Sequence, residues 1–492
     1  MAWPKEFERA FHPGAVAVVG ASTQVQWPGG TAFIATLQHL GFPGRIYPVN
    51  PKASEIRGLK AYPSVQSIPE PVDLVMVSVP SKAVPTVLED CIAAGARNIH
   101  IFTSGFDEIG TEEGRALSRK VLEIARRGNL HILGPNCMGL HVPAARLSTW
   151  EIRQAPSGPV AFVSQSGGHT GQFVGSAPIF GITISKAISF GNALLMDSTD
   201  LLEYLATDPE TKIIAMYLEG VRDGTKLTQM VKEINPTKPV LVWKGGLTES
   251  GARAVSSHTG SLGGAEATWE AFYRQTGAVR ADSLEELLDV IMCLLNLKPP
   301  RGRRVALMGA GGGNSVAGAD VCARAGLQMP VLTPETQRVL RQFIPPEGTS
   351  IRNPLDIGLV LQDIGLLQRA LEPVIADPVI DAVLFALPIG LLAGMARGRK
   401  VSPEEAEEIA NRHFENILSY LKDFRKERAQ GKALLIVLQV WGITGVSPGQ
   451  RARFRNRLVE EGFPTFNALE RAAAAYSKFV GYHEFQRQAG KA

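Results

Sequence analysis

The sequence predicts an α/β protein made of three consecutive doubly wound domains. Short apolar, β-rich runs alternate with helical patterns along almost the whole chain, which is typical of βαβ units and parallel sheets. The 492 residues, 45% of them hydrophobic, suffice for three domains at about 100 to 200 residues each. We expect a Rossmann-like N-terminal domain over residues 1–150, followed by two flavodoxin-like domains over residues 151–298 and 299–492.

The first domain is predicted from five strand-like runs between residues 15 and 139: AVAVVG, RIYPVN, DLVMVSVP, NIHIFTSG and HILGPNCMG. Gly20, Ala21 and Ser22 follow the first run, and Gly29 and Gly30 open a helical pattern. Backbone N–H groups at such a strand-to-helix turn are available to a ligand phosphate.

The second domain is predicted from the runs PVAFVSQSG, ISKAISFGN, KIIAMYLEGV and PVLVWKGG, and from an amphipathic helix at residues 284–297. A Pro- and Gly-containing linker at residues 298–302 precedes the third domain. That domain begins with RRVALMGAGGG and a helix around residues 315–325, and it continues with DAVLFALPIG, a charged helix at 403–426 and ALLIVLQVWG.

Composition excludes several classes of protein. The 51 Lys and Arg nearly balance the 47 Asp and Glu, and no long basic run indicates nucleic-acid binding. The N-terminus lacks an apolar signal segment, and no apolar stretch reaches the ~18 to 20 residues that span a bilayer. Four widely spaced cysteines without a CxxC pair indicate a reducing compartment, so we expect a cytoplasmic protein. They are Cys91, Cys137, Cys293 and Cys322.

The end of the second strand bears on the ligand of the first domain. An NAD site needs an acidic residue about 20 residues after the glycines to accept the ribose hydroxyls. This strand instead ends in Val49, Asn50, Pro51 and Lys52. A cation there suits a phosphate, so Lys52 argues against a dehydrogenase and for a ligand with a phosphorylated ribose, although an exposed lysine without a ligand is an equal alternative.

The motifs GAVAVVGAS, IYPVNPK, VSVPS, TSGFDEIG and LGPNCMG resemble, in this order, the CoA-binding domain of NDP-forming acyl-CoA synthetases. The resemblance implies coenzyme A as a substrate. The positions expected to bind it are Gly20, Ala21, Ser22, Asn50, Lys52, Val79, Pro80, Ser81, Ser104, Gly105, Phe106 and Asn136.

One histidine, His258, lies in a run of small residues at positions 251–264. We expect this run to be a mobile segment that exposes the imidazole, because it has few bulky side chains to pack. An imidazole nitrogen is a competent nucleophile for phosphoryl transfer, and a carboxylate on the other nitrogen would fix its tautomer. Glu219 ends the apolar run IIAMYLEG and is the candidate carboxylate.

Phosphate-binding positions are predicted at two further strand ends, namely Ser164, Ser166 and Gly167, and Gly191 with Asn192. Ordinary turn formation explains each of these segments equally well when it is taken alone. His169 follows at a helix start, and we regard it as secondary because a fixed helix terminus suits a carrier less than a mobile segment does.

The strings VSQSGG, SFGN, LLEYLATDPETK, YLEGV and KGGLTESGARAVSSHTGSLGG resemble the phosphohistidine domain of ADP-forming acetyl-CoA synthetases and, more distantly, the succinyl-CoA synthetase α chain. The resemblance implies that His258 is the phosphorylated residue, that Glu219 is its carboxylate partner, and that Ser164 and Ser166 cradle phosphate. We expect no metal site on this chain.

In the third domain, the glycine-rich loop at residues 309–314 lacks the Gly-Lys-Ser/Thr ending of a Walker A motif, so we do not predict ATP binding there. Together with RNPLD at 352–356, the loop resembles the third domain of the synthetase α subunit. The family more usually has Asn-Ala-Gly-Gly-Pro-Gly where this chain has GAGGGN, which leaves the role of the loop open.

The resemblance covers about residues 10–480 and stops where fused members of the family continue into an ATP-grasp domain. It implies an α subunit that interconverts acyl-CoA and phosphate with a carboxylic acid and CoA through acyl phosphate and phosphohistidine. A separate ATP-grasp β subunit would bind Mg²⁺ with ADP/ATP or GDP/GTP, in an α2β2 assembly or a homodimer. The alternative is a non-catalytic, CoA- or acyl-CoA-binding regulatory protein; the acyl group, the nucleotide and the direction stay open.

Overall fold

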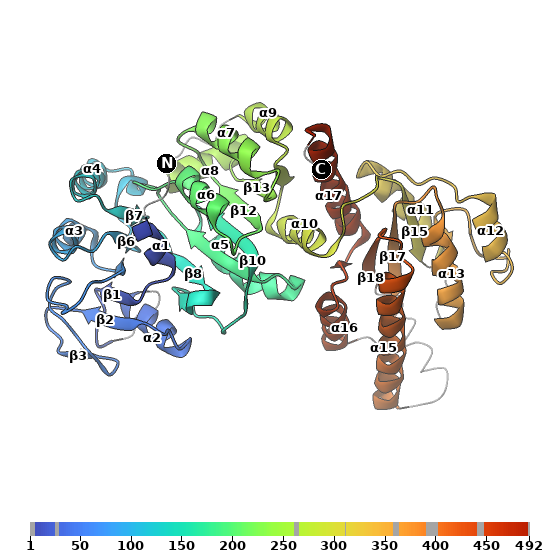
Figure 1. Ribbon diagram of the computed structural model, residues 1–492, viewed down its shortest axis with the longest axis horizontal. Helices are drawn as coiled ribbons and strands as arrows, with labels where there is room; N and C mark the ends of the chain where they lie inside the picture. Colours follow the sequence, from blue (N-terminus) through green and yellow to red (C-terminus); the bar gives the residue numbers. More distant parts are fainter. Residues whose placement is uncertain are drawn as a thin grey trace. The chain divides into compact units, whose positions relative to one another are not determined.

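The computed structural model describes residues 5–24, 29–259, 265–309, 311–357, 364–389, 402–439 and 447–490, without the side chains of 5, 6, 256–259, 388 and 403. The chain divides into two compact units, Met1–Pro178 with Ile182–Leu287 and Ile179–Gly181 with Leu288–Ala492. Figure 1 shows sheets flanked by helices in both units.

The first sheet has five parallel strands in the order β2-β1-β5-β6-β7. All five side chains of β1 are buried, as expected for a parallel strand covered on both faces. The strands are β1 Ala15–Val19, β2 Arg45–Val49, β5 Leu74–Val77, β6 Asn98–Ile101 and β7 His131–Leu133, with a hairpin of β3 Glu55–Ile56 and β4 Leu59–Lys60. The helices are α1 Lys5–Phe11, α2 Gly30–His39, α3 Val84–Ala93 and α4 Glu112–Arg127, with 3-10 turns η1 Ser81–Ala83 and η2 Asp107–Ile109.

The second sheet has seven strands in the order β14-β13-β12-β10-β11-β8-β9. Strand β8 is antiparallel to β11, so the segment before residue 151 extends this sheet rather than the first one. The strands are β8 Leu140–Val142, β9 Leu147–Ser148, β10 Ser157–Ser164, β11 Ile184–Ser189, β12 Ile213–Leu218, β13 Val240–Lys244 and β14 Val279–Ala281. The helices are α5 Gly167–Ser176, α6 Ser198–Thr207, α7 Gly224–Ile234, α8 Glu249–Thr259, α9 Glu266–Thr276 and α10 Leu284–Asn296, with 3-10 turns η3 Pro143–Ala145 and η4 Ala177–Phe180.

The third sheet has the order β16-β15-β17-β18-β19 and is parallel throughout. The charged stretch predicted as a helix at 403–426 forms α15, which begins at a Ser402–Glu405 capping box with a proline in its first turn. The strands are β15 Val305–Gly309, β16 Leu355–Asp356, β17 Ala382–Pro388, β18 Ala433–Gln439 and β19 Thr465–Phe466. The helices are α11 Gly312–Arg324, α12 Pro334–Leu340, α13 Ile364–Ala376, α15 Pro403–Glu427, α16 Pro448–Glu460 and α17 Leu469–Gln488.

All three sheets share one topology. When the central parallel strands of each sheet are numbered in chain order, the spatial order is 2-1-3-4-5 every time. The first strand therefore lies between the second and the third, and a ligand crevice is expected outside the carboxyl ends of the first and third strands. These pairs are β1 with β5, β10 with β12, and β15 with β17. The predicted doubly wound fold is confirmed.

One continuous apolar core joins the first two sheets into one unit. It contains residues from both, such as Val16 of β1 and Ile214 of β12. Helix α1 contributes Phe11, whose ring stacks on Tyr204 of α6 at 4.5 Å between centroids. Within the described segments, no helix is long and apolar enough to cross a membrane.

Two buried histidines stay neutral inside this unit. His100 of β6 is 1% exposed, and its Nε2 lies 3.0 Å from the carbonyl oxygen of Cys137. His141 of β8 is 4% exposed. Burial lowers the pKa of each imidazole from 6.5 to about 4, because the charged form would lose its hydration.

We predict that the free energy of unfolding falls as the pH is lowered from about 6.5 to about 4. In that window the unfolded chain protonates both histidines whereas the folded chain resists, which costs up to about 3 kcal/mol per histidine. Urea denaturation at several pH values measures the effect.

His100→Leu should lose about half of this pH dependence. His39→Leu, at an exposed position on α2, should keep all of it and serves as the control. Equal pH dependence in all three proteins would contradict the prediction.

Candidate active site

The carboxyl ends of β1 and β5 approach so closely that only glycine fits between them. Gly20 has φ +91°, and a Cβ there would lie 2.1 Å from the Ser78 carbonyl oxygen. Asn50, at the end of β2, donates from Nδ2 to the Ala21 carbonyl at 2.7 Å. The first domain thus brings four of the predicted CoA-binding positions, Gly20, Ala21, Asn50 and Val79, to one edge of its sheet.

The neighbouring loop also reaches this edge. A Cβ on Gly105 would lie 3.0 Å from the Ser81 hydroxyl, so these two predicted CoA-binding positions are adjacent. Ala21 and Phe106 are fully buried, so they can offer a ligand only their backbone. Ser104, Pro80 and Lys52 are exposed; Lys52 closes a turn in which its N–H donates to Asn50 Oδ1 at 2.8 Å.

Ser22 is tied to α2, because its N–H donates to the Thr31 hydroxyl at 2.8 Å. This bond holds the predicted phosphate-facing turn against the first turn of the helix.

In the second domain, the serine hydroxyls of the predicted phosphate-binding turn at residues 164–167 form hydrogen bonds within the turn itself. Ser164 Oγ donates to the Ser166 carbonyl at 2.9 Å and accepts from the Ser166 N–H at 3.0 Å. Ser166 Oγ caps α5 by accepting from the His169 N–H at 3.2 Å. A Cβ on Gly167 would lie 2.6 Å from the Met138 side chain, so the first turn of α5 packs closely on the loop that contains Met138.

Gln165, which the sequence reasoning missed, joins the carboxyl ends of β10 and β12. Its Oε1 accepts the backbone N–H of Glu219 and, at 2.9 Å, that of Gly220. The backbone N–H of Gln165 donates to the Tyr217 carbonyl at 3.2 Å. A polar side chain between two serines at a strand end was the available signal.

Glu219 is buried, at 5% exposed, and its Oε1 accepts from the Tyr217 hydroxyl at 3.3 Å. Lys244, at the end of β13, donates from Nζ to the Glu219 carbonyl at 3.0 Å and also to the Gly245 carbonyl. Burial lowers the pKa of Lys244 to about 8, and the charge of Glu219 opposes this shift. The sequence analysis did not single out this lysine.

His258 lies in the last turn of α8 rather than in a loop. The expectation of a loop from residue 251 is therefore wrong as far as residue 259, while residues 260–264 lie outside the described residues. Small residues do not prevent a helix here, because the Thr248 hydroxyl accepts the Gly251 N–H and Arg253 pairs with Glu249 one turn away. The side chain of His258 is outside the described part of the chain.

Helix α8 packs against η2 of the first domain, which brings the backbone around the predicted phosphate carrier to the side of the unit that contains the predicted CoA-binding positions Gly105 and Phe106. His169 has a different environment. Its ring packs on Tyr217 and Trp243 at 4.5 Å each, and its Nδ1 pairs with Gln172 at 3.2 Å.

The second predicted phosphate segment contacts the first domain directly. Gly191 has φ +53°, and a Cβ there would lie 2.4 Å from the carbonyls of both Pro135 and Asn136. The Asn192 N–H donates to the Pro135 carbonyl at 3.0 Å, and Asn136 Nδ2 donates to Asn192 Oδ1 at 3.2 Å. The structure therefore places Asn136, predicted for CoA, beside Gly191 and Asn192, predicted for phosphate.

In the third domain, the described part of the glycine-rich loop is held by Asp356, whose Oδ1 accepts the Gly311 N–H at 2.7 Å. Helix α11 begins directly afterwards, at Gly312. Within the described ranges, no group of three or more His, Cys, Asp or Glu side chains is placed to hold a metal ion.

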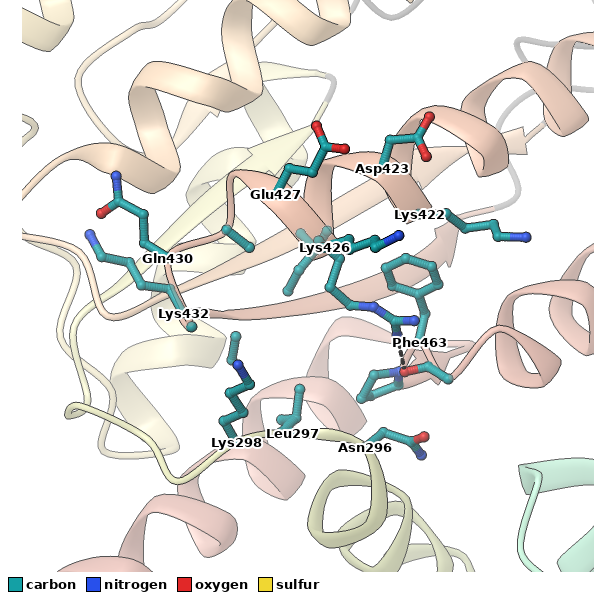
Figure 2. Close-up of a pocket in the computed structure, with 17 residues that line it drawn as sticks. Asn296, Leu297, Lys298, Lys422, Asp423, Lys426, Glu427, Gln430, Lys432 and Phe463 are labelled. Carbon is teal, nitrogen blue, oxygen red and sulfur yellow. Dashed lines mark hydrogen bonds between the residues drawn. The ribbon is translucent and has the colours of Figure 1, made fainter.

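A cleft of about 820 Å³ in the second unit lies at the opposite, amino edge of the third sheet, beside the start of β18 (Figure 2). The ends of α10, α15 and α16 meet there, so its cations compensate the negative carboxyl ends of helices. Arg425, for example, donates to the carbonyls of Glu461 and Gly462 at 2.6 and 2.7 Å. Because ligands of doubly wound sheets bind at the carboxyl edge, we do not place the active site in this cleft.

Comparison with known proteins defines the class of the chain. The family model described as a CoA binding domain matches residues 14–143, and the succinyl-CoA ligase like flavodoxin domain matches residues 157–294. The chain is 34% identical to acetate–CoA ligase (ADP-forming) II subunit alpha of Pyrococcus furiosus, over 94% of this chain and 95% of that protein. It is also 34% identical to the I subunit alpha of the same organism, over 97% and 98%.

The chain therefore belongs to the family of ADP-forming acetate–CoA ligase α subunits. A solved relative, the dinucleotide-forming acetyl-coenzyme A synthetase 1 of Ca. Korarchaeum cryptofilum in its apo form, has a TM-score of 0.80 at 30% identity, with 98% of this chain and 99% of that chain covered. The predicted family, fold class and acid–thiol ligase class are confirmed, and the relatives favour the catalytic subunit over the regulatory alternative.

We predict that Gln165→Leu destabilises the folded chain. The change leaves the N–H groups of Glu219 and Gly220 without their acceptor, and it should lower the free energy of unfolding by about 2 kcal/mol. Urea denaturation measures this loss. Gln172→Leu, at an exposed position on the following helix α5, should cost less than about 0.5 kcal/mol. Equal losses in the two variants would contradict the role given to Gln165.

Proposed function

We propose that this chain is the catalytic α subunit of an NDP-forming acyl-CoA synthetase, with an acyl-CoA, phosphate and a carboxylic acid as substrates and products. The observation that carries the proposal is the packing of α8, which contains His258, against η2 at the CoA-binding edge of the first domain. The proposed sites of thioester binding and phosphoryl capture would thereby lie on one side of one compact unit.

In the proposed reaction, CoA thioester binds along the carboxyl edge of the first sheet. A phosphate oxygen attacks the acyl carbon, the C–S bond breaks, and the CoA thiolate leaves, which yields an acyl phosphate. An imidazole nitrogen of His258 then attacks phosphorus, and the P–O bond to the acyl group breaks to release the carboxylate. Glu219 would accept the hydrogen bond of the other ring nitrogen and stabilise the cation that develops.

The remaining step is assigned to a partner. We propose a β subunit of the ATP-grasp type, whose Mg²⁺-bound ADP or GDP accepts the phosphoryl group from His258. The solved relative in complex with phosphate and ADP supports these two species as reactants. We further propose an α2β2 assembly or a homodimer in the cytoplasm; the four cysteines are free and buried, as suits a reducing compartment.

The proposed CoA site makes Lys52 a partner of the phosphate on the ribose. Lys52→Met should weaken CoA binding about tenfold, because an exposed charge-assisted contact is worth about 1 to 2 kcal/mol. Dephospho-CoA should bind both proteins alike in calorimetry. Lys60→Met, on the nearby hairpin strand β4, is the control and should leave CoA affinity unchanged.

His258 is tested by labelling. The purified chain is incubated with radiolabelled phosphate and a panel of acyl-CoAs, with and without an ATP-grasp partner. Wild-type chain should acquire acid-labile, alkali-stable label, His258→Ala should acquire none, and Glu219→Gln should lose at least about tenfold in labelling rate. His169→Ala is the matched control and should still be labelled.

The acyl-CoA that gives the most label identifies the substrate. If CoA binds but no condition labels the wild-type chain, the proposed synthetase reaction is wrong.

A further inference from the structure

Three N–H donors converge on the carboxylate of Glu108, a half-buried residue of η2. The backbone N–H groups of Gly105 and Phe106 donate to its Oε1, and the Phe106 N–H also lies 3.2 Å from Oε2. The third donor is Asn192 Nδ2, which reaches Oε2 from the second domain. This carboxylate therefore bridges two domains.

The donors are held by contacts that do not involve Glu108. Asn136 donates to Asn192 Oδ1 at 3.2 Å, so the amide of Asn192 is turned with its NH₂ group toward the carboxylate. Gly105 has φ +103°, and a Cβ there would lie 3.0 Å from the Ser81 hydroxyl, so the loop needs glycine to present its N–H. These donors form a preorganised set that suits an anion.

The two backbone bonds alone would be an ordinary local turn, since Glu108 lies only two and three residues from the donors. The bond from Asn192 spans 84 residues and is not local. All three donors belong to segments that the sequence predicts to bind CoA or phosphate, and α8, which contains His258, packs on η2 itself.

We propose that Gly105 N–H, Phe106 N–H and Asn192 Nδ2 form one subsite for the phosphate or acyl phosphate, and that Glu108 occupies this subsite until the substrate anion displaces it. The inference rests on the proposed function and adds to it a location for the phosphate and a residue that competes with it. A carboxylate and a phosphate oxygen accept the same donors, and two anions cannot share them without strong repulsion.

The test measures binding of inorganic phosphate to the full chain by calorimetry, without acyl-CoA. Glu108→Gln removes the competing charge and nearly keeps the shape, so phosphate should bind at least about tenfold more tightly than to wild type. Asp107→Asn is the matched control: it makes the same charge change one residue away on an exposed side chain, and affinity should change less than about threefold.

Asn192→Ala supplies a second measurement that does not depend on replacing Glu108. It removes a donor, so phosphate affinity should fall in the wild-type background, and the gain of Glu108→Gln should disappear in the double variant. Unchanged or weaker phosphate binding by a folded Glu108→Gln chain would overturn the proposal. So would unchanged binding by Asn192→Ala.

Phosphate binding tests the subsite and histidine labelling tests the synthetase reaction, so each proposal can be overturned without the other. Tighter binding by Glu108→Gln without any label on His258 would support the subsite and overturn the synthetase reaction. If His258 is labelled but the phosphate affinity is unchanged by Glu108→Gln and Asn192→Ala, the reaction is supported and this subsite is overturned.

Discussion

The carboxamide of Gln165 is the interaction on which the arrangement of the second domain's site depends. By accepting the N–H groups of Glu219 and Gly220, it joins the carboxyl ends of the two strands that flank the ligand crevice. An unpaired backbone N–H in this buried position would lower the stability of the fold. The bond therefore fixes the end of β12 and the position of Glu219, which follows it. Lys244 adds a second restraint from β13 by donating to the Glu219 carbonyl.

The repeated strand order explains why a contact between the ends of β10 and β12 matters. In each of the three sheets the first strand lies between the second and the third, so the loops after the first and third strands diverge and leave a crevice. In the first domain, the backbone at Gly20 approaches the Ser78 carbonyl so closely that this part of the crevice is lined by backbone atoms. In the second, buried polar side chains occupy it. The same topology therefore supports the two edges of the proposed site with different loop residues.

Apolar and polar contacts join the first two domains. A shared apolar core holds the domains in one compact unit, and polar contacts from Asn136 to Asn192 and from Asn192 to Glu108 cross between them. Core packing provides stability, whereas the polar bonds set orientation because they are directional. The proposed reaction, acyl transfer followed by phosphoryl transfer, would need both kinds of contact, because its reacting segments come from different sheets.

The sequence by itself determined the three doubly wound sheets, the strand ends at which we place the proposed site, and the family. Short apolar runs and turn residues are local signals, and motifs such as YLEGV and TSGFDEIG can be read along the chain. Tertiary structure decided which segments meet. Helix α8 replaces the expected loop because a cap at Thr248 and an ion pair at Arg253 outweigh the small residues. The roles given to Gln165, Lys244 and Glu108 each depend on a partner distant in sequence, and such a contact leaves no periodic or local signal.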